Sequence, residues 1–303
     1  MTTGPATPIK ATPSPPAPPP PRSAPSGGPP AEAPPPRPPA WWKTLRADAP
    51  TLYRLAIGGG FVGLILAVWW LITRGSPTEA FISPSKLPSP GAVFGSLGGL
   101  LDRDLEGALF ATMWRVVKGV ALAAIIGIAL GVSAGSYKAI AAAVNPIVLF
   151  LRSVPMGALL PLTLVWFSTG ERQKSMFIFL AVVPFVFSDT AKAVASVPQR
   201  YLETAETLGA SRGQIIRKVL VPLALPDIIT SLRFQFGLAL GYIMLAEAIN
   251  TDAGIGVLLN NGERRGLVEH NYLLLFIIAL LAFGIDWLIR YVQRGVFPYR
   301  RDL

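Results

Sequence analysis

The chain has 303 residues, of which 51% are hydrophobic and 15% are charged, and this balance is too apolar for a soluble domain with a solvated surface. The formal net charge is +10, yet the basic residues cluster between and beyond apolar runs, and no basic patch is interleaved with aromatic residues. This distribution favours a membrane protein and argues against a nucleic-acid partner. The chain contains no cysteine and a single histidine, His270, which excludes disulfides and argues against a histidine-based metal site.

The first forty residues are dominated by proline, alanine, serine and glycine. Such a composition cannot bury a core, so residues 1–40 are predicted to form a disordered, Pro-rich cytoplasmic tail. The tail also lacks the apolar run of a signal peptide. Trp41 and Trp42 follow it and are typical of an anchor at the membrane interface. Residues 41–303 are predicted to form the transmembrane domain.

Six apolar runs follow, and each is close to the roughly 20 residues that are needed to cross a hydrocarbon core. They cover about residues 55–72, 116–134, 140–167, 176–197, 228–249 and 272–289. The sequence therefore predicts an all-α integral membrane protein with six transmembrane helices. Between the first two runs, Pro90 is expected to begin an amphipathic helix on the external surface.

Small residues recur every four positions in the second run. They are Gly119, Ala123, Gly127, Gly131 and Gly135. A stripe of this kind lets another helix approach closely, and we expect it to pack within the subunit. Gly237 and Gly241 in the fifth run indicate a second close approach.

Several charged residues beside the apolar runs have simple interpretations. Asp189 and Lys192 are three apart, and Asp286 and Arg290 are four apart, so both are predicted to be pairs within one helix. Arg233 lies near the inner end of the fifth run and is expected to extend its side chain toward the interface.

The third run is too long and too interrupted for one regular helix. The interruptions are Pro146, Arg152, Pro155 and Pro161. Broken backbone at membrane depth is tolerated where it is buried in protein or lines a water-filled cavity. An arginine at a helix centre costs about 2.5–3.5 kcal/mol on insertion. Arg152 and Pro155 are therefore candidates for a translocation path; a structural anchor is an equal alternative, and an anionic substrate would favour the path.

Glu247 near the outer end of the fifth run is a further candidate for the path, because a carboxylate within a membrane is a functional candidate by default. The competing interpretation is an acid at the interface that is solvated or paired. The residues alone leave both open.

A polar segment, residues 198–222, joins the fourth and fifth runs and is called the elbow below. Pro198 begins a short helix that Gly209 is expected to end, since glycine readily takes the left-handed conformation past a helix terminus. Ser211 begins a second helix, with Gln214 at the spacing of a capping box.

Pro222 and Pro226 are predicted to end that second helix and to begin the fifth run. Leu202, Ala205 and Leu208 recur at helical spacing and give the first elbow helix an apolar face. This face fits a hairpin packed against its own bundle and fits a docking site for a partner equally well.

The charge distribution predicts the orientation. If the N-terminus is cytoplasmic, six crossings return the basic C-terminal tail to the same side, as the positive-inside pattern requires. The elbow is then cytoplasmic, and residues 168–174 and 250–271 are external. The elbow's basic residues are Arg200, Arg212, Arg217 and Lys218.

The elbow resembles the EAA loop of ABC transporter permeases, whose pattern is E-A-A, three residues, G, nine residues and I-x-L-P. The matching positions are Glu203, Ala205, Gly209, Val219, Val221 and Pro222. Thr204 stands in place of the second alanine, and two valines replace the isoleucine and leucine, so side-chain size or apolarity is kept. The segments PSKLPSPGAVF and PIVLFLRSVPMGALLPLTLVWFSTGE and the stretch from Glu203 to Ile249 are similar to the nitrate/sulfonate/taurine branch of binding-protein-dependent permeases. The resemblance covers roughly residues 42–303.

This resemblance implies the type I importer (MetI-like) permease fold and a homodimer in the lipid of a bacterial inner membrane. It implies a periplasmic or lipid-anchored substrate-binding protein that delivers a small solute, such as nitrate, a sulfonate or taurine. It also implies cytoplasmic ATPase subunits that bind ATP and Mg²⁺ and dock on the elbow. The elbow residues implied are Glu203, Thr204, Ala205, Gly209, Ala210, Arg212, Val219 and Pro222.

The chain has no G-x-x-x-x-G-K-[ST] loop for nucleotide phosphates and no recognisable catalytic arrangement. We therefore expect no catalytic residue, cofactor or metal in this chain, and ATP hydrolysis by another polypeptide. The alternative is an ion-gradient-driven secondary transporter acting through Arg152 and Glu247. That alternative would need matched broken helices in both halves, and only one broken run is evident. A membrane scaffold with a recruiting tail would leave the elbow unexplained.

Overall fold

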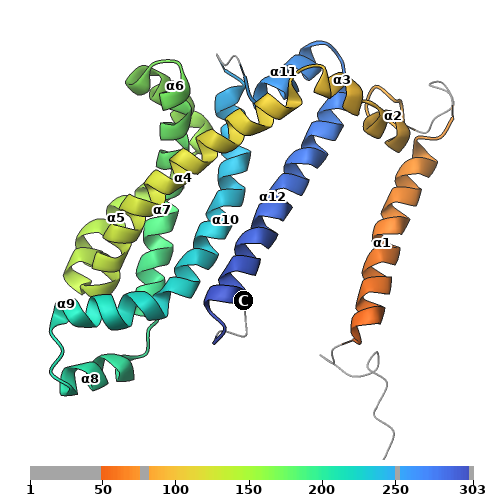
Figure 1. Cartoon of the computed structure of the whole chain (residues 1–303). Coiled ribbons are helices and arrows are strands. Elements are labelled where there is room, and N and C mark those ends of the chain that lie inside the picture. The colour runs from red at the N-terminus through yellow and green to blue at the C-terminus, as the bar shows by residue number, and fades with distance from the viewer. Residues whose placement is uncertain (1–48, 76–81, 250–252, 300–303) are drawn as a thin grey trace, which may run out of the picture. The chain divides into compact units, whose positions relative to one another are not determined.

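The structure, a computed structural model, describes residues 49–75, 82–249 and 253–299, and within these ranges it contains helices and no strands (Figure 1). The elements in chain order are α1 (Thr51–Ile72), α2 (Pro90–Gly95), α3 (Leu97–Leu101), α4 (Leu105–Ser136), α5 (Lys138–Ser153), α6 (Met156–Phe167), α7 (Glu171–Ala195), α8 (Gln199–Thr207), α9 (Arg212–Ile215), the π-helical turn η2 (Ile216–Leu220), α10 (Val221–Glu247), α11 (Ile255–Arg264) and α12 (Val268–Val296). The tail predicted over residues 1–40, and Trp41 and Trp42, lie outside the described residues.

Internal contacts divide the chain into two units, Met1–Gly59 and Gly60–Leu303. α1 begins in the first unit, and none of its residues is buried. Its exposed side chains include leucine, isoleucine, phenylalanine and tryptophan. A helix that is apolar on all sides suits contact with lipid.

Membrane-spanning character is evident in most of the long helices. Among the described residues, α1, α4, α7 and α12 are long and apolar enough to cross a membrane, and α5 with α6 forms one further apolar pair bent by 102°. α10 is not in this set but has 27 residues, which corresponds to about 40 Å. Because a hydrocarbon core is about 30 Å thick, a sixth crossing by α10 stays a prediction that its length permits.

The bend between α5 and α6 confirms that the third run is broken. The break lies at Val154 and Pro155, whose backbone is extended, as expected because a proline ring disfavours the helical conformation of the preceding residue. Pro146 and Pro161 lie inside α5 and α6, so the prediction that they also interrupt the helix was wrong. Arg152 occupies the last turn of α5.

The core is organised around α7, which packs against both α4 and α10. A Cβ atom built at Gly127 would lie 2.9 Å from the side chain of Val186. One built at Gly131 would lie 2.6 Å from Cβ of Thr190 and 2.8 Å from the carbonyl oxygen of Phe187. The small-residue stripe of α4 therefore allows the close helix approach that was predicted.

The second predicted close approach is absent within the described chain. A Cβ atom at Gly237 or Gly241 would meet nothing within 4 Å. The sequence pattern is the same in both helices, but only α4 turns its glycines toward a neighbouring helix.

Replacing Gly131 with alanine is expected to lower stability by about 1–3 kcal/mol, the usual cost of overpacking, because the new methyl group would overlap α7 backbone. The midpoint of thermal unfolding in detergent measures this. Gly284→Ala in α12 is the matched control, since a Cβ atom there meets nothing within 4 Å, and it should be neutral or slightly stabilising. Equal losses for both variants would contradict the packing assignment.

Polar contacts tie α7, α10 and α12 together near the core. Asp189 accepts hydrogen bonds from Ser231 Oγ at 2.7 Å and Gln235 Nε2 at 3.2 Å, so the predicted pairing within α7 is replaced by contacts to α10. Arg233 Nε lies 2.8 Å from Asp286 Oδ1 of α12 instead of reaching only toward the interface. The predicted pair between Asp286 and Arg290 is present.

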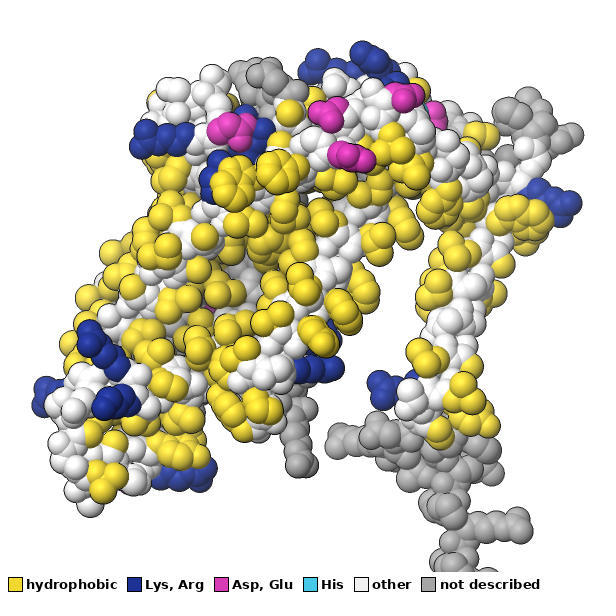
Figure 2. Space-filling view, in the orientation of Figure 1, with side chains coloured by type: hydrophobic (Ala, Val, Ile, Leu, Met, Phe, Trp, Pro, Cys, Tyr) yellow, Lys and Arg dark blue, Asp and Glu magenta, His cyan; other side chains and the backbone are white. Residues whose placement is uncertain are grey.

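A second cluster closes one end of the bundle. It joins α2, α3, α11 and the first turns of α12 through side chains that include Val93, Leu100, Ile255 and Leu274. Residues 250–271, predicted as an external segment without an assigned helix, include α11. In Figure 2 hydrophobic side chains cover the lengths of the helices of the second unit and charged side chains gather at their ends.

Candidate functional site

The elbow consists of α8, a tight turn, α9 and η2, and it lies between the ends of α7 and α10 (Figure 1). It joins the two helices that form the centre of the core. The elbow is therefore directly connected to the core of the bundle.

Gly209 ends the first elbow helix in the predicted way. Its φ is +77°, a left-handed conformation that side chains with a Cβ atom disfavour. Its N–H donates to the carbonyl of Glu206 at 2.9 Å, and the N–H of Ala210 donates to the carbonyl of Ala205 at 3.0 Å. This pair of bonds is a Schellman motif, and it fixes the direction in which the chain leaves α8.

The second elbow helix begins with the predicted capping box. The N–H of Gln214 donates to Ser211 Oγ at 3.4 Å, and the N–H of Ser211 donates to Gln214 Oε1 at 2.8 Å. Both bonds satisfy donors that a helix start leaves free. The turn between α8 and α9 is therefore held from both sides.

The prediction that Pro222 and Pro226 end the second helix was wrong. The backbone stays helical from α9 through η2 into α10, and Figure 1 shows the ribbon turning a corner there. Pro222 lies in the first turn of α10, where a missing N–H is tolerated. The π-helical turn η2 ends at Leu220, two residues before Pro222, and prolines and π turns are the usual causes of a helix bend.

The two faces of the elbow differ in their surroundings. Leu202 and Ala205 pack on a cluster that includes Ile215 and Leu220. Leu208, expected on the same apolar face, is 81% exposed. The exposed side chains also include Tyr201, Glu203, Thr204, Arg212 and Pro222, while Ala210 and Val219 are half-buried. The elbow is thus anchored inward and leaves apolar and charged groups free outward.

The three candidates for a translocation path do not converge. Arg152 lies in the last turn of α5, and its guanidinium sits 4.7 Å from the ring centre of Phe185. Pro155 is exposed at the α5–α6 bend. Glu247 lies at the end of α10 with an exposure of 0%, so it faces no open path in this conformation.

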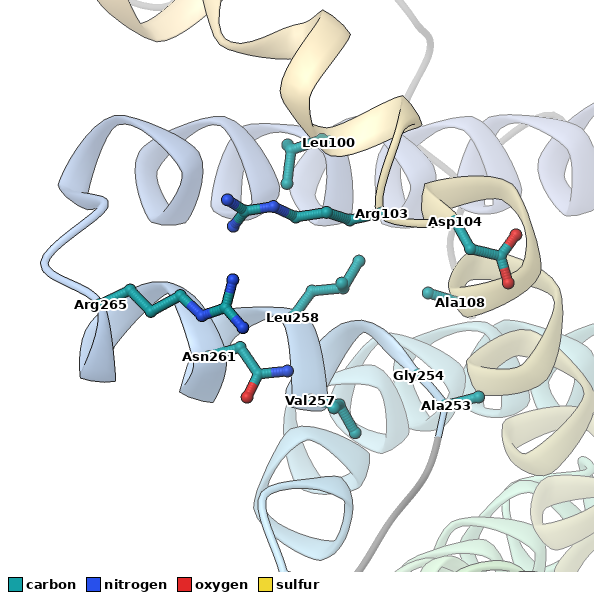
Figure 3. A pocket seen from close by; sticks show the side chains of 10 residues that line it. All are labelled: Leu100, Arg103, Asp104, Ala108, Ala253, Gly254, Val257, Leu258, Asn261 and Arg265. Carbon is teal, nitrogen blue, oxygen red and sulfur yellow. The ribbon is translucent and has the colours of Figure 1, made fainter.

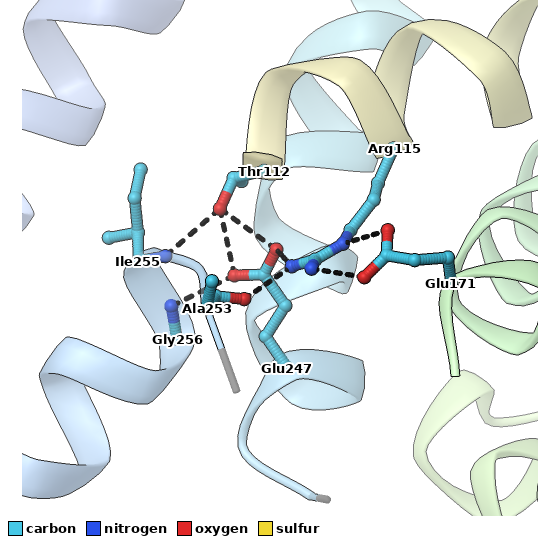
Figure 4. Close-up of polar contacts among 7 residues, drawn as sticks. All are labelled: Thr112, Arg115, Glu171, Glu247, Ala253, Ile255 and Gly256. Carbon is cyan, nitrogen blue, oxygen red and sulfur yellow. Dashed lines mark hydrogen bonds and ion pairs between the residues drawn. The ribbon is translucent and has the colours of Figure 1, made fainter. Parts of the chain in front are cut away.

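Glu247 belongs instead to a buried charged cluster, shown in Figure 4. Arg115, 3% exposed, donates from Nη1 to Glu247 Oε1 at 2.7 Å and to the carbonyl of Ala253 at 2.7 Å. Its Nε donates to Glu171 Oε2 at 2.7 Å, and Nη2 also contacts that carboxylate. One guanidinium therefore links α4, α7, α10 and the segment before α11.

The remaining bonds of Glu247 come from α4 and α11. Thr112 Oγ1 lies 2.8 Å and 2.9 Å from the two carboxylate oxygens, and the N–H of Gly256 donates at 2.9 Å. A buried charge requires such pairing and hydrogen bonding. The sequence analysis identified Glu247 as a candidate but not Arg115. The local sequence shows only that Arg115 lies one helical turn after Thr112.

A cavity of about 220 Å³ lies beside this cluster, between the start of α4 and α11 (Figure 3). Arg103, Asn261 and Arg265 point toward it. Asp104 also lines it, but its Oδ1 accepts a hydrogen bond from the N–H of Gly107 at 3.2 Å and caps α4. The cavity has a basic, hydrogen-bonding character.

Known proteins are similar to this chain over most of its length. The family described as binding-protein-dependent transport system inner membrane component matches residues 123–298. The taurine transport system permease protein TauC of Escherichia coli (strain K12) is 30% identical over 260 residues, which cover 84% of this chain and 93% of that protein. The nitrate import permease protein NrtB of Synechocystis sp. is 29% identical and covers 82% of this chain and 91% of its own length.

A solved structure agrees in fold. It is a chain of the MetNI methionine ABC transporter in an inward-facing conformation, with a TM-score of 0.58 and 23% identity, covering 63% of this chain and 95% of that one. The fold is therefore the MetI-like permease fold, as predicted. The chain belongs to the binding-protein-dependent transport system inner membrane components, the permease subunits of ABC importers.

Proposed function

We propose that two copies of this chain form the membrane core of an ATP-driven importer for a small anion. The relatives are named for taurine, nitrate, bicarbonate and aliphatic sulfonate transport, and solutes of this kind are the proposed substrate class. The observation that carries the proposal is the elbow, whose inner face is packed and whose outer face is free. Family membership removes the alternative of a gradient-driven carrier.

ATPase subunits are the proposed partners at the elbow. Exposed Leu208 would enter an apolar part of the partner's surface, and Glu203 and Arg212 offer charges of both signs around it. The partner would hold ATP and Mg²⁺, since this chain has no phosphate-binding loop. The elbow, both termini and the basic residues Arg200, Arg217 and Lys218 would then be cytoplasmic.

The proposed mechanism is alternating access. Closure of the ATPase subunits on ATP moves the two elbows, and each elbow moves α7 and α10, which are packed together. The two copies would rock about the membrane midplane, opening the path to one side at a time. This chain contributes the moving bundle and the path, and no step of the hydrolysis.

A substrate-binding protein is the proposed partner at the opposite end. Arg103 and Arg265 face the cavity of Figure 3, and neither has an ion pair among the salt bridges of the described residues. Acidic side chains on a docking partner would complement them. Rim charges of this kind steer association and fix its register.

The test is co-purification of the detergent-solubilised chain with ATPase subunits encoded beside it. Leu208→Ser should reduce recovery of the ATPase by roughly tenfold, the effect of about 1.4 kcal/mol. Leu97→Ser is the matched control, because Leu97 is also an exposed leucine but lies in α3 at the opposite end.

Full recovery with Leu208→Ser would move the docking site off the elbow. A wild-type chain that purifies alone and moves taurine or nitrate into vesicles without ATP would overturn the importer proposal.

A further inference from the structure

A second cavity, of about 550 Å³, runs along the bundle beside the elbow. Its walls come from the last turn of α4, the length of α5, the second half of α7 and the inner side of α8. Gln199, Leu202 and Leu220 of the elbow close one end of it. We call it the inner groove.

Three basic side chains line the inner groove, and no acidic residue does so among the described residues that form its wall. They are Lys138, Arg152 and Lys192. Lys138 and Lys192 are exposed and Arg152 is half-buried. None of the three takes part in a salt bridge of the described chain. The groove therefore has an uncompensated positive charge.

The three cations are spread along the groove rather than gathered at one point. Lys138 begins α5 and Arg152 lies in its last turn, a separation of about 21 Å along the helix axis. Arg152 is level with Phe185, over whose ring it lies at 4.7 Å, and Lys192 follows Phe185 by about 10 Å along α7. The charges thus form a series that leads from the α5–α6 bend toward the elbow.

Asp189 is the nearby acid that could neutralise these three cations, but its carboxylate is bound to α10 and not to the groove. Asp189 lies on α7 one turn before Lys192, but its carboxylate accepts hydrogen bonds from Ser231 and Gln235 of α10. Arg152 in turn has an aromatic ring for its main contact, which shields its stem without cancelling its charge. The positive field in the groove is a property of the fold.

We propose that the inner groove is the anion-conducting part of the translocation path, with Arg152 at its deep end and Lys192 and Lys138 toward its inner mouth. This inference rests on the proposed import function and assigns its substrate class from this chain itself. A groove lined by charge of one sign with low-dielectric walls concentrates ions of the opposite sign. Asn145 and Ser188 in the same wall supply neutral hydrogen-bonding groups to a passing anion.

Contact with elbow residues links the width of the groove to the position of the elbow. Because Leu202 and Leu220 belong both to its wall and to the cluster that anchors the elbow, movement of the elbow changes the width of the inner mouth. Opening of the anion path would then follow the state of the ATPase subunits.

The lack of cysteine makes a direct test simple. Ser188→Cys introduces a single thiol into the groove of the full chain, in nanodiscs of neutral phosphatidylcholine. Two methanethiosulfonate reagents of similar size, one carrying a sulfonate and one a quaternary ammonium, each form a mixed disulfide with it and release methanesulfinate. The anionic reagent should react about tenfold faster than the cationic one, after correction for their rates with a free thiol.

The source of this preference is tested by removing one charge at a time. Arg152→Gln, Lys192→Gln and Lys138→Gln should each lower the ratio of anionic to cationic rates severalfold, and Arg152→Lys should restore it. Arg264→Gln is the matched control, since it removes an exposed cation in the last turn of α11, at the opposite end. Equal rates for the two reagents, or ratios that the groove variants leave unchanged, would overturn the proposal.

Two further measurements are needed. One distinguishes a free anionic solute from a lipid headgroup, and the other distinguishes failure of the groove proposal from failure of the import proposal. Free nitrate or an aliphatic sulfonate in neutral nanodiscs should slow labelling of the thiol, whereas protection only in nanodiscs that contain anionic lipid would identify a headgroup site and contradict a solute path. Labelling needs no ATPase, so loss of the ratio rejects the groove alone. Loss of ATPase co-purification rejects the import function and leaves the labelling result standing.

Discussion

Gly209→Val should nearly abolish ATP-driven uptake while the chain still inserts and the bundle still folds. A left-handed conformation costs a residue with a Cβ atom about 1–2 kcal/mol, and φ at Gly209 is +77°. Valine would push the turn out of this conformation and break the Schellman bonds donated by the N–H groups of residue 209 and Ala210. Because a Cβ atom at Gly209 would meet nothing within 4 Å, the strain would displace α8 relative to α9 without a clash in the core. Uptake by the reconstituted complex, set against its ATP hydrolysis, measures the loss of coupling.

Gly209→Asn is the matched control for this result. Asparagine enters the left-handed region more readily than valine does, so it should retain most of the uptake. An uptake rate for Gly209→Val equal to that of the wild type would remove the turn from the mechanism. Equal losses for valine and asparagine would point to a steric clash with the partner instead of backbone strain.

Arg115→Met should lower the stability of the bundle more than Gly131→Ala does. Glu247 is 0% exposed, and removing one partner of a buried ion pair costs about 3–5 kcal/mol. Arg115 also joins α4 to α7 and to the segment before α11. Thermal unfolding in detergent and the yield of monodisperse protein would report the loss.

Two variants separate the buried contact from the exposed one. Glu171→Gln should cost far less, because Glu171 is 56% exposed and such pairs contribute about 0–1 kcal/mol. Glu247→Gln combined with Arg115→Met should be less harmful than the sum of the single changes, since neither charge is then left buried alone. Additive losses would show that the two residues act independently.

Local rules of the sequence predicted the elbow well. Gly209 and the pair Ser211 and Gln214 act over a few residues, through backbone conformation and caps, and the structure has both features where they were expected. The glycine stripe of α4 also succeeded, because helical spacing puts its members on one face. The prolines were less informative, since Pro222 and Pro226 lie within a helix that continues from η2 through α10.

Contacts between distant parts of the chain were not predictable from local pattern. Arg115 and Glu247 are separated by 132 residues, and no spacing rule relates them. Gly237 and Gly241 have the spacing of a close-packed face, yet the orientation of α10 leaves them open within this chain. α11 was missed because its apolar residues are embedded in a polar, glycine-rich segment and pack only against the cluster that joins α2, α3, α11 and α12.

The helical backbone turns a corner between α9 and α10, so the continuous helix has a short arm and a long arm that run in different directions (Figure 1). The short arm consists of α9 and η2 of the elbow. The long arm is α10, which ends at Glu247, the ion-pair partner of Arg115. Because the backbone stays helical through the corner, although Pro222 and Pro226 supply no N–H, we expect a sideways displacement of the short arm to tilt the long arm. The buried contact between Arg115 and Glu247 would then hold the far end of α10 while the rest of the helix tilts. A regular α-helical turn in place of η2 would stiffen the corner. The movement of α10 should then be smaller, even if every contact at either end were kept.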